Sequence, residues 1–342
     1  MSLQTQPADA PSIDTLRAGR PLLEAMRTSH WIKNAFVLAP ILFSRRYDEP
    51  LAWLYMAPAV IAFCLLSSAV YLINDVRDRQ ADLAHPVKRN RPIASGRLGA
   101  GAAITWSAVL AIAGLALASS VAYLHLGGFP SPQPSAGHTP PLGGLGLPVW
   151  AAVYFGLNIA YSFKLKHYNV VDVLVVAIGF VLRAMAGAAA ISVPVSPWLV
   201  VCTLSLCLYI ALAKRRGEVA DLGAGQAAQA RAVNRSYDPR DLEHMIAVSA
   251  SMALLTYSIY CLAPSTIQHV GSAHMVWTIP LVVYGMFRYN RITRQVGQGD
   301  PTAALARDRG MWFVLLAFVA LTALVQKFGA TPFFRTILEL PK

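Results

Sequence analysis

Residues 51–73, LAWLYMAPAVIAFCLLSSAVYLI, contain no charged side chain. A helix needs about 20 apolar residues to cross the ~30 Å hydrocarbon core of a bilayer. Lipid offers the backbone no hydrogen-bond partner, so a segment that crosses it must be a helix or a strand of a closed barrel. Barrel strands alternate apolar and polar residues, and this run does not. The run therefore predicts a membrane-spanning helix.

The rest of the chain has the same apolar character. Of its 342 residues, 56% are hydrophobic and 13% are charged, whereas soluble domains carry about 25% charged residues. The chain is therefore predicted to be an all-α, polytopic membrane protein with about nine transmembrane helices. The apolar segments are roughly 31–44, 51–73, 98–126, 147–163, 170–191, 196–213, 243–263, 273–290 and 311–327.

Lysine and arginine gather in alternate loops. They are frequent before the first segment and after the second, fourth, sixth and eighth, whereas 125–148, 192–197 and 263–274 contain no Lys, Arg, Asp or Glu. Because cytoplasmic loops carry an excess of basic residues, we expect an inner (plasma) membrane protein with its N-terminus and these basic loops in the cytoplasm. The net charge of +12 then reflects contact with anionic membrane lipids, and no nucleic-acid partner is expected.

These features divide the chain into three parts. Residues 1–30 are expected to form a cytoplasmic N-terminal arm, 31–327 a single transmembrane domain and 328–342 a C-terminal tail. The Pro/Gly-rich stretch 127–147 is typical of a flexible linker and would lie on the external side.

An aspartate-rich stretch, NDVRDRQAD, follows the second segment directly. Asp75, Asp78 and Asp82 are spaced by three and then four, which puts all three on one face of a continuing helix. Carboxylates clustered in this way repel one another unless a cation neutralises them. With the neighbouring Asn74 they offer the hard oxygen ligands that suit Mg²⁺, which usually bridges to substrate phosphates. The stretch therefore predicts a magnesium site.

The same stretch has a simpler interpretation. Arg77 and Arg79 lie between the aspartates. They could pair with the carboxylates at a solvated helix end, with no metal bound. The sequence leaves this alternative open.

Basic residues follow immediately, in HPVKRNRPIASGR at 85–97. Lys88, Arg89 and Arg91 could neutralise phosphate oxygens, which arginine does with two parallel hydrogen bonds. Alternatively, they are ordinary basic residues of a cytoplasmic loop. Beside an acidic metal cluster, the phosphate-binding interpretation is favoured.

A second group of polar residues surrounds the start of the fifth segment. Tyr161 and Lys166 precede it, and Asp172 is a lone carboxylate that enters it. Arg183 lies about eleven residues into the segment. An ionisable residue at this depth is a functional-site hypothesis, because its burial requires a partner, here an anionic one. His167 is more typical of an interfacial loop than of a catalytic base.

A third group follows the sixth segment, in AKRRGEVAD at 213–221, where Lys214 and Arg215 lie. On the first segment, Lys33 and Asn34 are expected near the same cytoplasmic surface. All three polar groups would then face one side of the membrane.

Together these motifs resemble the UbiA superfamily of intramembrane prenyltransferases. Within it they are most similar to the decaprenyl-phosphate phosphoribosyltransferase branch. The matching pieces are HWIKN, SSAVYLINDVRDRQADLAHPVKRNRPIASG, YSFKLKHYNVVDV, RAMAGAAA, KRRGE, TIPLVVYGMFRY and GDPTAALARDRG, in order between residue 30 and about residue 310.

The resemblance implies a UbiA-like helical bundle as the catalytic domain, Mg²⁺ as cofactor, and transfer of 5-phosphoribosyl from phosphoribosyl diphosphate to a polyprenyl phosphate, with release of pyrophosphate. A homo-oligomer is possible. Asn74, Asp75, Asp78 and Asp82 would hold the metal, and Lys88 and Arg91 would join the three aspartates in catalysis. The substrate-binding residues would be Lys33, Asn34, Asn74, Tyr161, Lys166, Asp172, Arg183, Lys214 and Arg215.

Two other functions remain open. Quinone-type prenyltransferases of the superfamily transfer a polyprenyl chain from its diphosphate to an aromatic or quinone precursor, and they carry a second aspartate-rich motif after the sixth span. This chain has the basic KRRGE there, which suits a phosphate-bearing substrate better. A transporter of a phosphorylated solute is the remote alternative, since Arg183 lies within a span, whereas nearly all other charge lies outside the spans.

Overall fold

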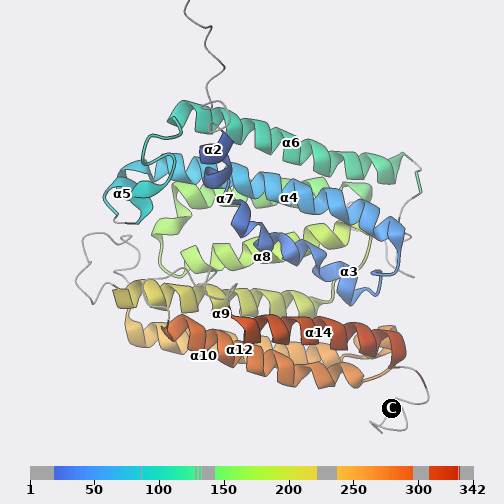
Figure 1. Ribbon diagram of the computed structural model, residues 1–342. Helices are drawn as coiled ribbons and strands as arrows, with labels where there is room; N and C mark the ends of the chain where they lie inside the picture. The colour runs from blue at the N-terminus through green and yellow to red at the C-terminus, as the bar shows by residue number, and fades with distance from the viewer. Residues whose placement is uncertain are drawn as a thin grey trace, which may run out of the picture.

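The structure is a computed structural model that describes residues 19–85, 87–127, 129–130, 132, 143–221, 237–295, 308–329 and 331. Within these ranges the chain forms helices and turns and no strand, which confirms the all-α prediction. The elements are packed into a bundle (Figure 1). In chain order they are α2 (Gly19–Ala25), η1 (Thr28–Leu38), α3 (Ala39–Phe43), α4 (Pro50–Arg77), α5 (Arg79–Leu83), η2 (Lys88–Asn90), α6 (Ala100–Leu126), η3 (Gly143–Leu145), α7 (Gly146–Phe163), η4 (Leu165–His167), α8 (Val171–Ala190), α9 (Pro197–Asp221), α10 (Pro239–Leu262), α11 (Pro264–Val270), η8 (His274–Thr278), α12 (Ile279–Gln295) and α14 (Arg309–Phe328).

The expected count of nine spans is not confirmed. Among the described residues, six helices are long and apolar enough to cross a membrane, namely α4, α6, α8, α9, α10 and α14. A seventh span is possible if α11 and the following η8–α12 segment, which meet at 95°, form one broken crossing. The first apolar segment forms the 3₁₀ helix η1 and the short α3 instead of one long helix. Most of the linker at 127–147 and of the tail at 328–342 lies outside the described residues.

Small residues allow α4 and α6 to pack closely. A methyl group added to Gly114 of α6 would lie 2.9 Å from Leu66 Cγ of α4. Ser107 Oγ donates a hydrogen bond to the carbonyl oxygen of Ala69 across the same interface, at 2.8 Å. In lipid, where no hydrophobic effect drives helices together, close packing and such hydrogen bonds stabilise the contact.

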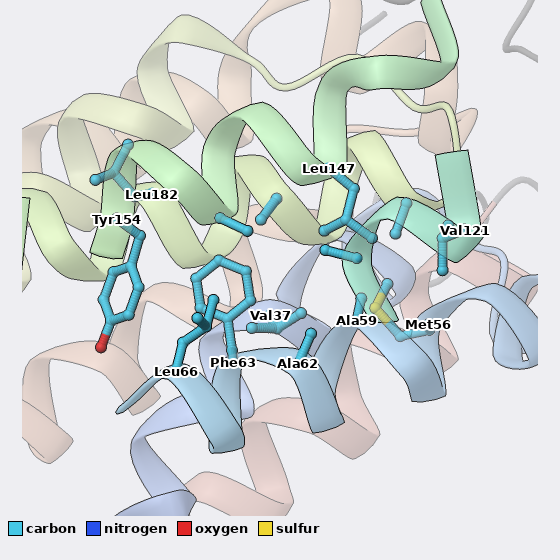
Figure 2. Close-up of a cluster of buried hydrophobic side chains, with 14 of the residues drawn as sticks. Val37, Met56, Ala59, Ala62, Phe63, Leu66, Val121, Leu147, Tyr154 and Leu182 are labelled. Carbon is cyan, nitrogen blue, oxygen red and sulfur yellow. The ribbon is translucent and has the colours of Figure 1, made fainter. Parts of the chain in front are cut away.

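The core of this half of the bundle lies between α4, α6, α7, α8 and η1. Figure 2 shows the Phe63 ring of α4 beside Tyr154 of α7, with ring centroids 5.0 Å apart. The element η1 approaches α8 so closely that a Cβ atom at Gly187 would overlap the carbonyl oxygen of Val37. Glycine at this position is therefore what lets the first segment pack into the bundle.

The second half of the bundle consists of α9, α10, α12 and α14. Tyr209 donates from its hydroxyl to the carbonyl oxygen of Met286 at 2.7 Å, and Tyr289 to that of Ile210 at 3.2 Å, so that α9 and α12 are joined within the apolar cluster. The end of α9 and the start of α10 lie at the same end of the bundle as α5 (left in Figure 1). The polar motifs of the sequence therefore meet at one end of the molecule.

Candidate functional site

The aspartate-rich stretch is not a continuous helix, contrary to the prediction. The helix α4 ends at Arg77, Asp78 adopts φ −89° and ψ 4°, and α5 starts at Arg79. Asn74 Nδ2 donates to Asp78 Oδ2 at 3.1 Å. The interruption is local, because the backbone N–H of Asp78 still donates to the Asn74 carbonyl oxygen at 2.9 Å, and that of Asp82 to the Asp78 carbonyl oxygen at 2.8 Å.

Arg91 joins the two buried carboxylates of the stretch. Its Nη1 atom lies 2.7 Å from Asp82 Oδ2 and 3.3 Å from Asp75 Oδ1. Only 2% of Asp75 and 5% of Asp82 is exposed to solvent. Burial raises the pKa of the Asp82 carboxyl, and the charge and hydrogen bond of Arg91 act in the opposite direction. The turn thus brings both oxygens to a single cation, as the metal-site hypothesis requires.

Lys166 holds the third carboxylate. Its Nζ atom donates to Asp78 Oδ1 at 2.5 Å and to Asn74 Oδ1 at 3.3 Å, although the lysine comes from η4, far away in the chain. The lysine is itself 4% exposed. The predicted site residues Asn74, Asp78 and Lys166 are therefore in direct contact.

Arg27 belongs to the same site and was not among the predicted site residues. Its Nη2 atom lies 2.5 Å from Asp75 Oδ1, and its guanidinium group stacks 4.8 Å from the centre of the Tyr71 ring. In the sequence, Arg27 is one more basic residue before the first segment. Its position three residues ahead of HWIKN is the only local signal.

The simpler interpretation of the stretch named Arg77 and Arg79 as the partners of the carboxylates, and these two partners are not the ones that the structure shows. Arg77 and Arg79 are exposed, and Arg77 stacks over the ring of Phe163. The three carboxylates instead pair with Arg27, Arg91 and Lys166, which all come from other segments.

The residues of this cluster fit a divalent cation. Among the described residues, no three His, Cys, Asp or Glu side chains are already arranged around one metal position. Asp75 and Asp82 nevertheless flank one position, which Arg91 Nη1 occupies. Mg²⁺ is commonly held by one or two carboxylates, with waters and substrate phosphates completing its shell. Asp75 and Asp82 would supply these two carboxylates if Arg91 turns away from them, with Asp78 and Asn74 as neighbouring oxygen donors.

A second cluster joins α8 to α9 and α10. Asp172 is fully buried and accepts from Arg215 Nη2 at 2.5 Å and from the Tyr237 hydroxyl at 2.6 Å. Arg215 also pairs with Glu218. Asp172 and Arg215, both predicted to bind substrate, are thus bound to each other. No local sequence pattern points to Tyr237, which lies 65 positions from Asp172.

Tyr237 also fixes the backbone ahead of α8. Its hydroxyl oxygen accepts from the backbone N–H of Val170 at 2.8 Å. Val170 has φ 67°, a left-handed conformation that β-branched residues rarely adopt. Burial, and then the hydrogen bond to Asp172, raise the pKa of Tyr237 above its ordinary value.

The two clusters lie at the same end of the bundle, where α5 and the end of α9 are found (Figure 1). Burial and then the charge of Lys88 lower the pKa of His85, which follows α5, and the carboxylate of Glu218 acts in the opposite direction.

Arg183 and Asn34 form a separate group within the helix core. Arg183 donates from Nε to Asn34 Oδ1 at 2.8 Å, from Nη2 to the Tyr154 hydroxyl at 2.7 Å and from Nη1 to the Gly179 carbonyl oxygen at 3.0 Å. The anionic partner expected for Arg183 is not found among the described side chains. Neutral oxygens and the ring of Tyr154, 4.5 Å from the guanidinium carbon, surround it instead.

Four more predicted site residues complete the set. The side chains of Lys33, Lys88 and Tyr161 are half-buried, and that of Lys214 is exposed. Of the GDPTAALARDRG motif, only Asp308 and the two residues that follow are described. The roles of these residues remain predictions.

Comparison with known proteins identifies the family to which this arrangement belongs. The family model described as "UbiA prenyltransferase family" matches residues 36–316. The chain belongs to the UbiA prenyltransferase family. It is accordingly an enzyme of the transferase class, with homologues named decaprenyl-phosphate phosphoribosyltransferase.

Among these UbiA-family relatives, the decaprenyl-phosphate phosphoribosyltransferase of Mycobacterium tuberculosis is 31% identical over 312 residues, covering 90% of this chain and 95% of the relative. That of Mycolicibacterium smegmatis is 29% identical over 330 residues, covering 93% and 95%. A UbiA homologue from Archaeoglobus fulgidus, solved with GPP and Mg²⁺, is 14% identical with a TM-score of 0.66, covering 90% of this chain and 99% of the other. The solved structure shows that the fold is shared.

Proposed function

We propose that this UbiA-family enzyme transfers 5-phosphoribosyl from phosphoribosyl diphosphate to a polyprenyl phosphate and releases pyrophosphate, with Mg²⁺ as cofactor. The observation that carries the proposal is the cluster of Asp75, Asp78 and Asp82, each paired with a cation from another segment. A magnesium diphosphate offers this cluster both charges it can bind, a cation for the carboxylates and an anion for the basic side chains. The relatives named above favour phosphoribosyl diphosphate as its source.

The residues at the end of α9 support this branch over the quinone-type one. That branch carries an aspartate-rich motif after the sixth span for a second metal, whereas this chain has Lys214, Arg215 and Arg216 there. The basic residues Lys214 and Arg215 suit additional phosphate oxygens instead.

The chemistry is a substitution at C1 of the donor ribose. An oxygen of the polyprenyl phosphate forms a bond to C1, and the bond from C1 to the diphosphate oxygen breaks, with its electron pair leaving on pyrophosphate. The lipid phosphate is already ionised at neutral pH, so no strong general base is required. When bound, Mg²⁺ would neutralise the charge that develops on the leaving group.

The protein's own residues would bind and orient the reactants. Lys166, Arg91 and Lys88 supply positive charge where the leaving diphosphate becomes more negative, which stabilises the transition state electrostatically. Asp75, Asp78 and Asp82 orient the metal-bound end of the donor. Fixing both substrates in line removes much of the entropic part of the barrier.

We place this site on the cytoplasmic side of the inner membrane. The ends of α4, α7 and α9 carry the basic loops, while the loops at 125–148, 192–197 and 263–274 contain no Lys, Arg, Asp or Glu. Cytoplasmic loops are the basic ones. The water-soluble donor would then enter from the cytoplasm, and the lipid from the bilayer.

The test is a choice between donors. The purified protein in nanodiscs, with Mg²⁺, is given labelled phosphoribosyl diphosphate with polyprenyl phosphate, or labelled prenyl diphosphate with an aromatic acid. We expect label to enter the lipid phase as a phosphoribosylated lipid only in the first reaction. Product only in the second reaction would overturn the proposal in favour of the quinone-type branch.

A further inference from the structure

The backbone at Arg27 has a conformation that arginine seldom adopts. It joins α2 to η1 with φ 52° and ψ 53°, in the left-handed region. Residues other than glycine are uncommon there, and such conformations are found at functional sites where the surroundings maintain them. The consequence here is local: the turn brings a guanidinium group from the N-terminal helix to Asp75.

At Asp75, two guanidinium groups share one carboxylate oxygen. Arg27 Nη2 lies 2.5 Å and Arg91 Nη1 3.3 Å from Asp75 Oδ1. Arg91 has a second carboxylate partner in Asp82, whereas Asp75 is the only carboxylate with which Arg27 pairs among the described residues. A cation bound by Asp75 would therefore deprive Arg27 of its carboxylate.

Arg27 is placed to bind an anion beside Asp75. Its side chain is 20% exposed, against 2% for Asp75, so it borders the open side of the contact. The Tyr71 ring supports one face of the guanidinium plane. A planar guanidinium group held in this way keeps its remaining N–H donors available for two parallel hydrogen bonds to a phosphate group.

The helix α2, which ends two residues before Arg27, is joined to the basic loop. Arg97 donates to both carboxylate oxygens of Glu24, at 2.7 and 3.0 Å, and to the carbonyl oxygen of Asn90 at 2.5 Å. Glu24 lies in α2, and Asn90 directly precedes Arg91. The Arg97 side chain thus links the segment before Arg27 to the segment before Arg91.

We propose that Arg27 is a diphosphate-binding residue that Asp75 holds in place until a divalent cation takes over that carboxylate. The metal and the diphosphate then bind cooperatively, because the metal replaces Arg27 on Asp75 and frees its guanidinium group for a phosphate. This inference rests on the proposed function only in requiring a metal diphosphate at the site.

The proposal predicts two effects of opposite sign for Arg27→Gln. Without the competing guanidinium group, the metal alone should bind more tightly. The diphosphate should bind more weakly, by about tenfold to a hundredfold, the range of one or two charge-assisted hydrogen bonds. A purely structural arginine would weaken both ligands or neither.

The experiment measures both ligands directly on the full-length protein in nanodiscs. Free Mn²⁺ is followed by electron paramagnetic resonance without diphosphate, and inorganic pyrophosphate binding is measured by calorimetry at saturating Mn²⁺. Arg77→Gln is the matched control, because Arg77 is a basic residue two positions from Asp75 that pairs with no carboxylate among the described residues. Arg27→Lys keeps the charge and should recover part of the pyrophosphate affinity.

We expect Arg27→Gln to bind Mn²⁺ more tightly and pyrophosphate more weakly than the wild type. We expect Arg77→Gln to bind both ligands with wild-type affinity. Arg27→Gln that binds both ligands like the wild type, or binds both more weakly, would overturn the inference. Pyrophosphate is released from either candidate donor, so this signature together with no transfer from phosphoribosyl diphosphate would refute the proposed function and leave the inference standing. Wild-type protein that binds no pyrophosphate with Mn²⁺ would refute both.

Discussion

Lys166 donates from Nζ to Asp78 Oδ1 at 2.5 Å, across 88 positions of the sequence. The contact ties the α7–α8 connection to the end of α4, and with it the second polar motif to the first. Two predicted site residues that no local pattern connects are thus direct partners. In the proposed mechanism this ion pair would break when the substrate binds. Asp78 would then contact the metal, and Lys166 the diphosphate.

Replacing Lys166 should therefore impair transfer. Lys166→Met leaves Asp78 without its cation and removes a positive charge from the leaving-group end, and we expect the initial rate of transfer to fall by about tenfold or more. The measurement is labelled phosphoribosyl transfer into lipid. Lys164→Met, at an exposed lysine two positions earlier, serves as the control and should retain the wild-type rate. Equal rates in the two variants would contradict the role of Lys166.

The approach of η1 to α8 predicts a large effect of a single methyl group. In Gly187→Ala the new Cβ atom would overlap the backbone of Val37, so a rigid segment has to move. Overpacking of this kind costs about 1–3 kcal/mol. Thermal unfolding in detergent should show a clearly lower midpoint for Gly187→Ala. At Gly156 the same substitution meets no atom within 4 Å, and a comparable loss in Gly156→Ala would show that the effect is not specific to this contact.

Tyr237→Phe tests the second cluster. The substitution removes one hydrogen bond from the buried Asp172 and the acceptor for the Val170 N–H. A buried polar group that loses its partner costs about 1–3 kcal/mol, so the midpoint of thermal unfolding should fall. Tyr168→Phe, at an exposed tyrosine between η4 and α8, should leave the midpoint unchanged. A stable Tyr237→Phe variant would mean that the hydroxyl does not hold this end of α8.

The start of α14 predicts a pH dependence of stability. Hydrogen bonds from Arg288, at 2.6 and 3.0 Å, lower the pKa of Asp308 below its ordinary value of 3.8. A carboxyl group whose pKa is lowered on folding stabilises the protein at pH values above its pKa in the unfolded state. This contribution is lost as the pH falls through its pKa in the folded state. The difference in midpoint between wild type and Asp308→Asn should therefore be constant between about pH 5 and pH 8 and shrink below pH 4. A difference that grows on acidification would have the wrong sign for this ion pair.

Hydropathy could predict where most helices lie, but not how the first and eighth apolar segments are folded. The run at 51–73 became α4, with one residue added before it and four after it, because apolar length and lack of charge are what lipid requires. Whether a short run forms a 3₁₀ helix such as η1, or starts with one as the eighth segment does at η8, depends on neighbours that the pattern does not specify.

The site, like the fold, could be predicted from the sequence only in part. Charge repulsion could predict that Asp75, Asp78 and Asp82 need cations, and all three have them. Which cations they take could not be predicted, because Arg27 reaches Asp75 across 48 positions through an unusual backbone turn. Adjacent Arg77 was the obvious partner in sequence and points elsewhere.

The most direct test of the central claim is mass spectrometry of the lipid product. Wild-type protein in nanodiscs is incubated with Mg²⁺, phosphoribosyl diphosphate and polyprenyl phosphate, in parallel with Asp75→Asn, with Asp78→Asn and with wild type in excess EDTA. We predict a polyprenyl phosphate whose mass has increased by one phosphoribosyl group in the wild type, and its loss in the three other samples. Unmodified lipid in the wild-type sample, or full product in both aspartate variants, would contradict the account.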